Sequence, residues 1–167
     1  GEMRLVGEPQ AALRGGQCML KPRVEARMLQ DLQLTKDDRV LEIGAGSGYM
    51  AALMAYQAAQ VVTLELDPQL AQMARDNLER AGITNASVRQ ADGAVDSLPE
   101  GPFDAIVLSG SVAEVPARLL AQLSDRGRLL AITGQEPVMR VTLVRRKGDR
   151  FEVSYPWDVN AARLQHF

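Results

Sequence analysis

The sequence predicts an α/β fold: a mostly parallel, doubly wound sheet with helices on both faces and a C-terminal antiparallel hairpin. Short apolar runs such as residues 39–43 and 61–66 alternate with stretches of helical periodicity. This alternation is typical of parallel strands joined by helical crossovers. Near the end of the chain, Gly148-Asp149 separates two strand-like runs, 139–146 and 150–155, which indicates a hairpin.

The start of the chain differs in composition from the rest. Its first 20 residues are rich in Gly, Pro and Gln and lack periodicity. We therefore expect an arm or loop over residues 1–20 and a single domain over residues 21–167. The first helix is expected at residues 22–34, where Val24 and Met28 belong to one apolar face.

Helices follow each of the two apolar runs. A helix is expected over residues 49–58, after the first run. The second run leads into Asp67-Pro68, a strong helix start, because Asp caps the free backbone N–H groups and Pro fits the first helical position. The 3.6-residue period then continues to Ala81, and Gly82 ends it.

The second half of the chain continues the pattern with weaker signals. Residues 87–90 form a short, polar run that suits an edge strand. Residues 103–108 are apolar except for Asp104, which predicts a strand buried on both faces. A helix at 117–123 and a strand at 127–132 follow.

Composition excludes several classes of protein. The chain has 167 residues, 46% of them hydrophobic, and a net charge of −2. That length suits one domain, and the charge argues against a nucleic-acid partner. No apolar run reaches the ~20 residues of a membrane span, and Cys18 is the only cysteine, so no internal disulfide can form. We therefore expect a cytoplasmic protein that does not bind membranes.

The single histidine is also informative. His166 is the second-last residue of the sequence, and we expect its side chain to be solvated. Without an internal histidine, a Ser-His-Asp triad and a His/Cys metal cluster are both excluded, so no metal is predicted. The sequence does not identify a catalytic residue.

The strongest motif is the glycine loop that follows the first strand. It runs Glu42-Ile43-Gly44-Ala45-Gly46-Ser47-Gly48. Glycines at every second position allow close backbone approach to a ligand, and the next helix offers free N–H groups to a carboxylate. A dinucleotide fingerprint would require glycine where Tyr49 stands, and a P-loop would require lysine. The loop therefore predicts a nucleotide-like ligand that is neither a dinucleotide nor the phosphate group bound by a P-loop.

Further candidates follow the other strands. In open α/β sheets, ligands bind beyond the carboxyl ends of the strands. Glu65, with Leu66 next to it, ends the second strand and could accept hydrogen bonds from ribose hydroxyls. Asp92-Gly93 ends the third strand, and the Asp92 carboxylate could accept a hydrogen bond from the amino group of an adenine. Ser109 follows the fourth strand and should line the same crevice, whereas Ser111 reads as a helix cap.

These motifs resemble those of a known family. The Glu-x-Gly-x-Gly-x-Gly pattern is shared by S-adenosylmethionine-dependent methyltransferases. Within that class the chain is similar to the protein-L-isoaspartate O-methyltransferases, over about residues 16–155. The similarity rests on Gly16-Gln17 with Pro22, on residues 91–93, 102–106, 114–116 and 127–129.

The resemblance implies a Rossmann-like fold, S-adenosyl-L-methionine as cofactor, and methyl transfer to a carboxylate. It also implies cofactor contacts from the glycine loop, Glu65, Asp92-Gly93 and the stretch that contains Met19. The chain departs from the family pattern in four places. Leu20 stands where the family has a serine, the N-terminal segment is short, residues 109–112 replace an Ala-rich loop, and the tail after Tyr155 differs.

Two other functions stay open at this point. One is a methyltransferase with a different acceptor, which could be a protein, a peptide or a small molecule. The other is a non-catalytic S-adenosylmethionine-binding protein, which the loss of the serine motivates. The sequence does not predict the oligomeric state.

Overall fold

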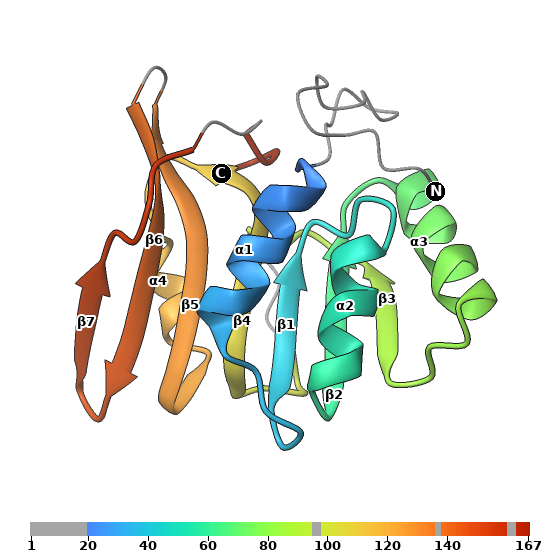
Figure 1. Cartoon of the computed structure of the whole chain (residues 1–167), viewed down its shortest axis with the longest axis horizontal. Helices are drawn as coiled ribbons and strands as arrows, with labels where there is room; N and C mark the ends of the chain where they lie inside the picture. The colour runs from blue at the N-terminus through green and yellow to red at the C-terminus, as the bar shows by residue number, and fades with distance from the viewer. Residues whose placement is uncertain (1–19, 95–97, 136–137, 160–162) are drawn as a thin grey trace.

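A single sheet forms the centre of the protein. The computed structural model describes residues 20–94, 98–135, 138–159 and 163–167. Within these residues, seven strands pair in the order β3-β2-β1-β4-β5-β6-β7 (Figure 1). The strands are β1 (Arg39–Ile43), β2 (Gln60–Glu65), β3 (Ala86–Gln90), β4 (Phe103–Val112), β5 (Leu123–Gln135), β6 (Val138–Lys147) and β7 (Arg150–Ser154).

The strand directions confirm the predicted sheet. The first five strands are parallel to one another, whereas β6 is antiparallel to β5 and β7 is antiparallel to β6. The terminal hairpin turns at Gly148, whose φ is +61°, as its turn signal predicted. The short, polar β3 lies at one edge of the sheet, also as predicted.

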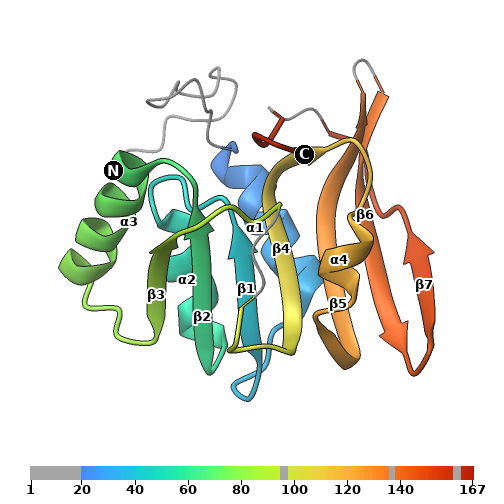
Figure 2. The same cartoon turned by 180° about the vertical axis from the view of Figure 1, so that it is seen from behind.

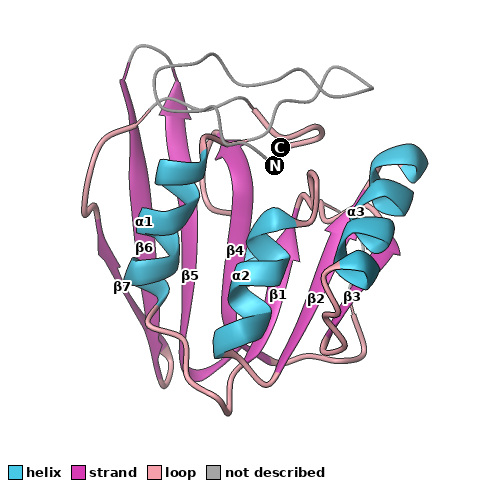
Figure 3. Cartoon of the chain, turned by 45° about the vertical axis from the view of Figure 1, so that its right-hand side comes forward, coloured by secondary structure: helices cyan, strands magenta, loops and turns pink. Residues whose placement is uncertain are grey.

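Helices cover the two faces of the sheet unequally. On one face lie α1 (Pro22–Leu32), α2 (Tyr49–Gln57) and α3 (Pro68–Arg80), side by side (Figures 1 and 3). On the other face lies α4 (Ala117–Leu120), a single turn (Figure 2). Non-helical residues complete that second face, among them Leu98, Leu164 and Phe167.

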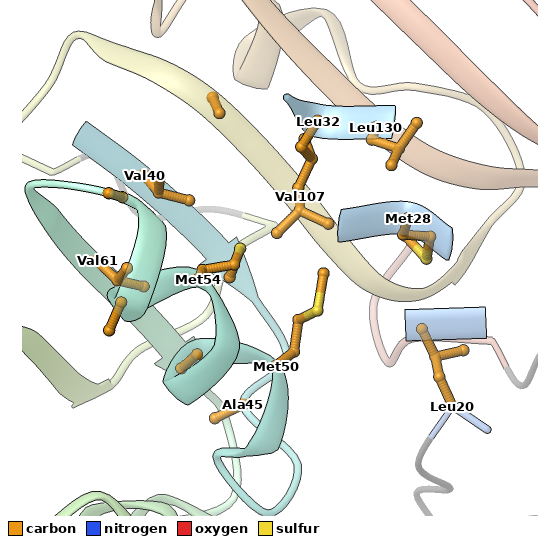
Figure 4. Packing of buried hydrophobic residues seen from close by; sticks show 14 of the residues in the cluster. Leu20, Met28, Leu32, Val40, Ala45, Met50, Met54, Val61, Val107 and Leu130 are labelled. Carbon is orange, nitrogen blue, oxygen red and sulfur yellow. The ribbon is translucent and has the colours of Figure 1, made fainter. Parts of the chain in front are cut away.

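Methionine and leucine build the core beneath the three helices. Met28 of α1, Met50 and Met54 of α2, and Val107 and Leu130 of the sheet pack together (Figure 4). Aromatic residues make up only 4% of the chain. Unbranched methionine fills the irregular spaces between the helices and the sheet, and each fully buried side chain of this size contributes about 1.5–3 kcal/mol.

Local signals fix the start of α3. The Asp67 side chain accepts hydrogen bonds from the backbone N–H groups of Gln69 and Leu70, at 2.8 and 3.3 Å. Pro68 occupies the first helical position. The cap predicted from Asp67-Pro68 is therefore confirmed, and it places the end of β2 directly before α3.

Two sets of contacts, one buried and one half-buried, fasten α1 to the rest of the fold. The Arg128 guanidinium donates to the Leu32 carbonyl at 2.7 Å and pairs with Asp38 at 2.7 Å. The Trp157 Nε1–H donates to the Asp31 carboxylate at 2.6 Å, and Arg27 stacks on the same indole. The C-terminal half of α1 is therefore held by Arg128 and Trp157, from the last third of the chain.

The structure corrects the predictions around β4. This strand continues to Val112, so Ser109 and Ser111 lie inside it and not in a loop after it. Small polar residues suggested a loop, but pairing with β5 resumes at Ser111 after a bulge. The helix predicted at 117–123 is shortened to one turn because Leu123 already pairs with Phe103 at the start of β5.

Among the described residues, no helix is long and apolar enough to cross a membrane.

Candidate cofactor site

The glycine loop joins β1 to α2 and needs its glycines for backbone conformation. Gly44, Gly46 and Gly48 have φ values of +93°, +53° and +88°, in the left-handed region that favours glycine. Gly48 is also the N-cap of α2, and a Cβ atom there would lie 3.2 Å from the Ala74 carbonyl oxygen. Because α3 leaves no room for a side chain, the loop can pass this point only with glycine.

Glu65 holds this loop in place. Its Oε1 accepts from the Ala45 N–H and its Oε2 accepts from the Asp67 N–H, each at 3.1 Å. The side chain is buried at the end of β2. Burial raises its pKa, and hydrogen bonds from the backbone of Asp67, Gly46 and Ala45 act against that rise. The carboxylate therefore ties the glycine loop to the start of α3.

Glu42 lies beneath the loop and is completely buried. It accepts hydrogen bonds from the Thr63 hydroxyl at 2.7 Å and from the Ser109 hydroxyl at 2.5 Å. Burial raises its pKa to about 7, although these hydroxyls favour the charged form and the neighbouring Glu65 disfavours it. The structure thus brings together three predicted site residues from three adjacent strands.

A third buried acid, Glu25, escaped the sequence analysis. It lies on α1, is only 9% exposed, and no hydrogen bond from the described residues reaches its carboxyl group. Burial, together with Glu42, raises its pKa to about 8. A signal was present in the sequence, because Glu25 interrupts the apolar face that contains Met28 and Leu29.

Asp92-Gly93 lies where predicted, directly after β3. Asp92 Oδ1 accepts from the Ala94 N–H at 2.9 Å, and Oδ2 lies 2.6 Å from His166 Nδ1. Burial acts to raise the Asp92 pKa, but the hydrogen bonds from His166 and Ala94 hold it below its usual value. A Cβ atom on Gly93 would lie 2.6 Å from Ile43, so only glycine fits against β1.

A cavity of about 20 Å³ lies between the loop and these acids. Its lining combines five of the predicted residues with the last part of the chain. The predicted residues are Gly44, Glu65, Leu66, Asp92 and Gly93, and those from the end of the chain are Leu164, Gln165 and Phe167. Of the other candidates, Ala45, Gly46, Ser47 and Gly48 form the loop, Glu42 and Ser109 lie beneath it, and Met19 lies outside the described residues.

The expectation for Ser111 was wrong, and the one for His166 was incomplete. His166 is exposed, as expected, but its side chain is also hydrogen-bonded to Asp92. Ser111 is not a helix cap, because it is fully buried in β4, where its hydroxyl has no partner among the described residues. Leu20, at the position of the family serine, packs into the core beneath α1.

These features define the class of the protein. A glycine loop after β1 and acidic residues after β2 and β3 meet at the carboxyl edge of a mostly parallel sheet, where open α/β proteins bind nucleotides. The fold is Rossmann-like, and the neighbours in shape described below are methyltransferases.

Comparison with known proteins gives the family. Residues 8–160 match the profile of the protein-L-isoaspartate(D-aspartate) O-methyltransferases. The chain belongs to this family. It is 46% identical over 134 residues to the protein-L-isoaspartate O-methyltransferase of Methanoculleus marisnigri, which covers 80% of this chain and 61% of the relative.

Solved structures agree with this placement. A protein-L-isoaspartate O-methyltransferase matches with a TM-score of 0.78 and 28% identity, over 86% of this chain and 47% of the other. A Plasmodium falciparum protein, named as a candidate member of the same family and solved with S-adenosyl-L-homocysteine, has a TM-score of 0.79 at 23% identity. It covers 93% of this chain and 79% of the other, and it shows the shared fold.

The chain spans about three fifths of the length of the curated relatives that it matches.

Proposed function

We propose that this chain binds S-adenosyl-L-methionine and transfers its methyl group to a carboxylate, in particular the free carboxylate of an isoaspartyl residue in a protein or peptide. Membership of the family supports the reaction. The geometry of the cofactor site supports S-adenosyl-L-methionine as the ligand. The lone cysteine further supports a reducing, cytoplasmic setting.

The observation that carries the proposal is a group of three buried carboxyl groups without a cation. Glu25, Glu42 and Glu65 come from α1, β1 and β2, and the pKa of each is raised. Among the described residues, none of the ion pairs involves these three acids. Buried carboxyl groups that face no protein cation fit a ligand that brings positive charge and favours their ionised form, and S-adenosyl-L-methionine carries a sulfonium and an ammonium group.

We assign the cofactor contacts as follows. The backbone of Gly44–Gly48 and the start of α2 would hold the amino-acid part, because a helix N-terminus favours a carboxylate. Glu65 would hold the sugar, and Asp92 and Gly93 the base. Leu66, Ser109 and Met19 complete the proposed set, and Glu42 and Glu25 form its acidic wall.

The proposed methyl transfer requires few catalytic side chains from the protein. The bound cofactor would supply a methyl group that is already activated by the sulfonium charge. The acceptor carboxylate is already ionised near pH 7, so no general base is required. The chain's part is to hold the acceptor in line with that methyl group and to keep water out. Leu20 is buried beside α1, at the position where the family serine would add a hydroxyl.

Binding by calorimetry tests the ligand. Titration with S-adenosyl-L-methionine should give an affinity that falls about tenfold in Glu25→Gln, because one favourable charge is lost. Asp92→Asn should weaken binding by a similar factor. Glu79→Gln on the exposed side of α3 is the matched control and should bind as the unaltered chain does. Undiminished binding in both site variants would refute the assignment.

The affinity should also depend on pH. A bound cation favours the charged form of Glu25, whose pKa is about 8, so cofactor binding should release a proton and strengthen between pH 6 and 9. Glu42, with a pKa of about 7, and Glu65 act in the same direction. Titrations in buffers with different ionisation enthalpies measure the proton release. A Glu25→Gln variant that releases as many protons would contradict this role for Glu25.

The acceptor needs a separate assay. An isoaspartyl peptide incubated with methyl-labelled cofactor should acquire a base-labile methyl ester, whereas the same peptide with normal aspartate should not. Cofactor binding without ester formation would instead support another acceptor or a non-catalytic binding protein.

A further inference from the structure

The last described residues of the chain lie across the proposed cofactor site. This segment, Arg163–Phe167, is called the strap here. We propose that the strap is an autoinhibitory element that fills the cofactor crevice and must leave before the nucleoside part of the cofactor can bind. The inference rests on the proposed function.

One end of the strap is fastened to β4. Arg163 forms a parallel bridge with Ser111, and the Leu164 N–H donates to the Ser111 carbonyl at 2.8 Å. The Arg163 guanidinium also donates to the Gly134 carbonyl, at 2.7 Å. The strap therefore lies at the carboxyl ends of β4 and β5 through backbone and side-chain contacts.

Its apolar side chains enter the space beside the glycine loop. Leu164 is only 8% exposed and belongs to the core cluster of the second face of the sheet, and Phe167 packs against that cluster. A Cβ atom on Gly44 would lie 3.1 Å from the Leu164 side chain. The strap is therefore packed directly on the first glycine of the loop.

The strap is also hydrogen-bonded to Asp92, the acid that we assign to the base of the cofactor. His166 Nδ1 lies 2.6 Å from Asp92 Oδ2, and Asp92 Oδ1 already accepts from Ala94. Both carboxylate oxygens thus have partners within the chain. A ligand amine could reach Asp92 Oδ2 only in competition with His166.

The remaining volume decides between a strap that contacts the cofactor and one that excludes it. The cavity lined by Gly44, Glu65, Asp92 and the strap measures about 20 Å³, room for about one water molecule. Pockets for ligands of this size measure about 300–1,000 Å³. The strap and the nucleoside therefore cannot occupy the crevice together.

The strap lies outside the part of the chain that matches the family profile. The match to the family profile ends at residue 160, and the strap begins at Arg163. Occupation of the site by this segment is therefore not implied by family membership. It would reduce the apparent cofactor affinity in proportion to the time that the strap is seated.

Calorimetry with S-adenosyl-L-homocysteine tests the proposal. A chain that lacks residues 163–167 should bind about 10-fold more tightly or better, as expected if the strap is seated at least about 90% of the time. Phe167→Ala and His166→Ala should tighten binding by smaller factors. Phe151→Ala removes an equally large, exposed aromatic side chain far along the sheet, on β7, and should leave the affinity unchanged. Equal or weaker binding by the deletion variant would overturn the strap proposal.

A second measurement does not depend on the deletion variant folding. His166 is the chain's only histidine, so the untagged protein gives a single imidazole signal by NMR. Saturating S-adenosyl-L-homocysteine should shift this signal to the position it has in Asp92→Asn, because the contact with Asp92 is lost. A signal unmoved by saturating ligand would overturn the proposal. Absence of binding to both the full chain and the deletion variant would overturn the proposed function itself, and the strap proposal with it.

Discussion

At the scale of single residues, the acids around the glycine loop differ in how their buried carboxyl groups are hydrogen-bonded. Glu42 and Glu65 accept hydrogen bonds from hydroxyls and backbone N–H groups, so both are satisfied although they are buried. Glu25 is equally buried and has no such partner among the described residues. An isolated buried carboxyl group usually remains protonated, and its pKa of about 8 agrees with this.

Glu25 should therefore make the protein less stable as the pH rises. Its folded pKa of about 8 lies above the ordinary value of 4.5, so between these values the folded chain holds a proton that the unfolded chain has lost. Each such group lowers the free energy of unfolding by up to about 1.4 kcal/mol per pH unit in that window. Glu25→Gln should flatten this decline and be more stable than the unaltered chain at pH 8. Urea unfolding at pH 5, 6.5 and 8 measures the slopes.

Glu79→Gln is the control, because it removes an exposed acid of the same type from α3 and should leave the slope unchanged. If Glu25→Gln declines with pH as steeply as Glu79→Gln, then Glu25 is charged in the folded protein and its assignment here is wrong.

At the scale of elements, the turn from β1 to α2 depends on both conformation and space. Gly48 combines a φ of +88° with close contact to α3, whereas Gly82, just after α3, has a φ of +72° and open space around it. The two sites separate the cost of the backbone conformation from the cost of a steric clash.

Alanine at these two sites should therefore have unequal effects. Gly82→Ala should cost about 1 kcal/mol of stability, from the left-handed conformation alone. Gly48→Ala should cost at least about 1 kcal/mol more, because its Cβ would press on the Ala74 backbone of α3. Chemical denaturation of the two variants gives the comparison, and equal losses would show that α3 yields freely at this contact.

Local signals explain which elements could be predicted. Asp67-Pro68, Gly82 and Gly148-Asp149 act on their immediate neighbours, and the elements that they begin or end were predicted to within a few residues. The end of β4 could not be predicted in this way. Ser111 is a strand residue only because β5 continues beside it, and no pattern near Ser111 encodes that pairing.

At the scale of the whole molecule, the site is assembled from distant parts of the chain. The glycine loop and the acids after β2 and β3 could be placed together from the sequence, because parallel strands end at one edge. The strap could not, since His166 meets Asp92 across 74 residues and its pattern resembles a solvated tail. Glu25 was missed because helical periodicity was used to find apolar residues, and a single acid among them received no weight.

Ligand binding should be visible in the thermal stability of the whole protein. S-adenosyl-L-homocysteine at about 100 times its dissociation constant should add about 2.7 kcal/mol, which is about 5–10 °C in Tm for a chain of this size. At one fixed concentration, the chain without residues 163–167 should gain more than the full chain, because it binds more tightly. Differential scanning calorimetry measures both. NAD, whose fingerprint Tyr49 interrupts, should give no shift, and an equal shift with NAD would contradict the ligand class.

The contact between Trp157 and α1 gives the protein a built-in optical reporter. Trp157 is the only tryptophan, and its indole touches Arg27 and Asp31 across more than 120 residues of sequence. Its emission should therefore change when the first helix separates from Trp157. Because α1 also carries Glu25, an unlabelled sample in a fluorimeter should reveal whether this helix shifts when a ligand binds.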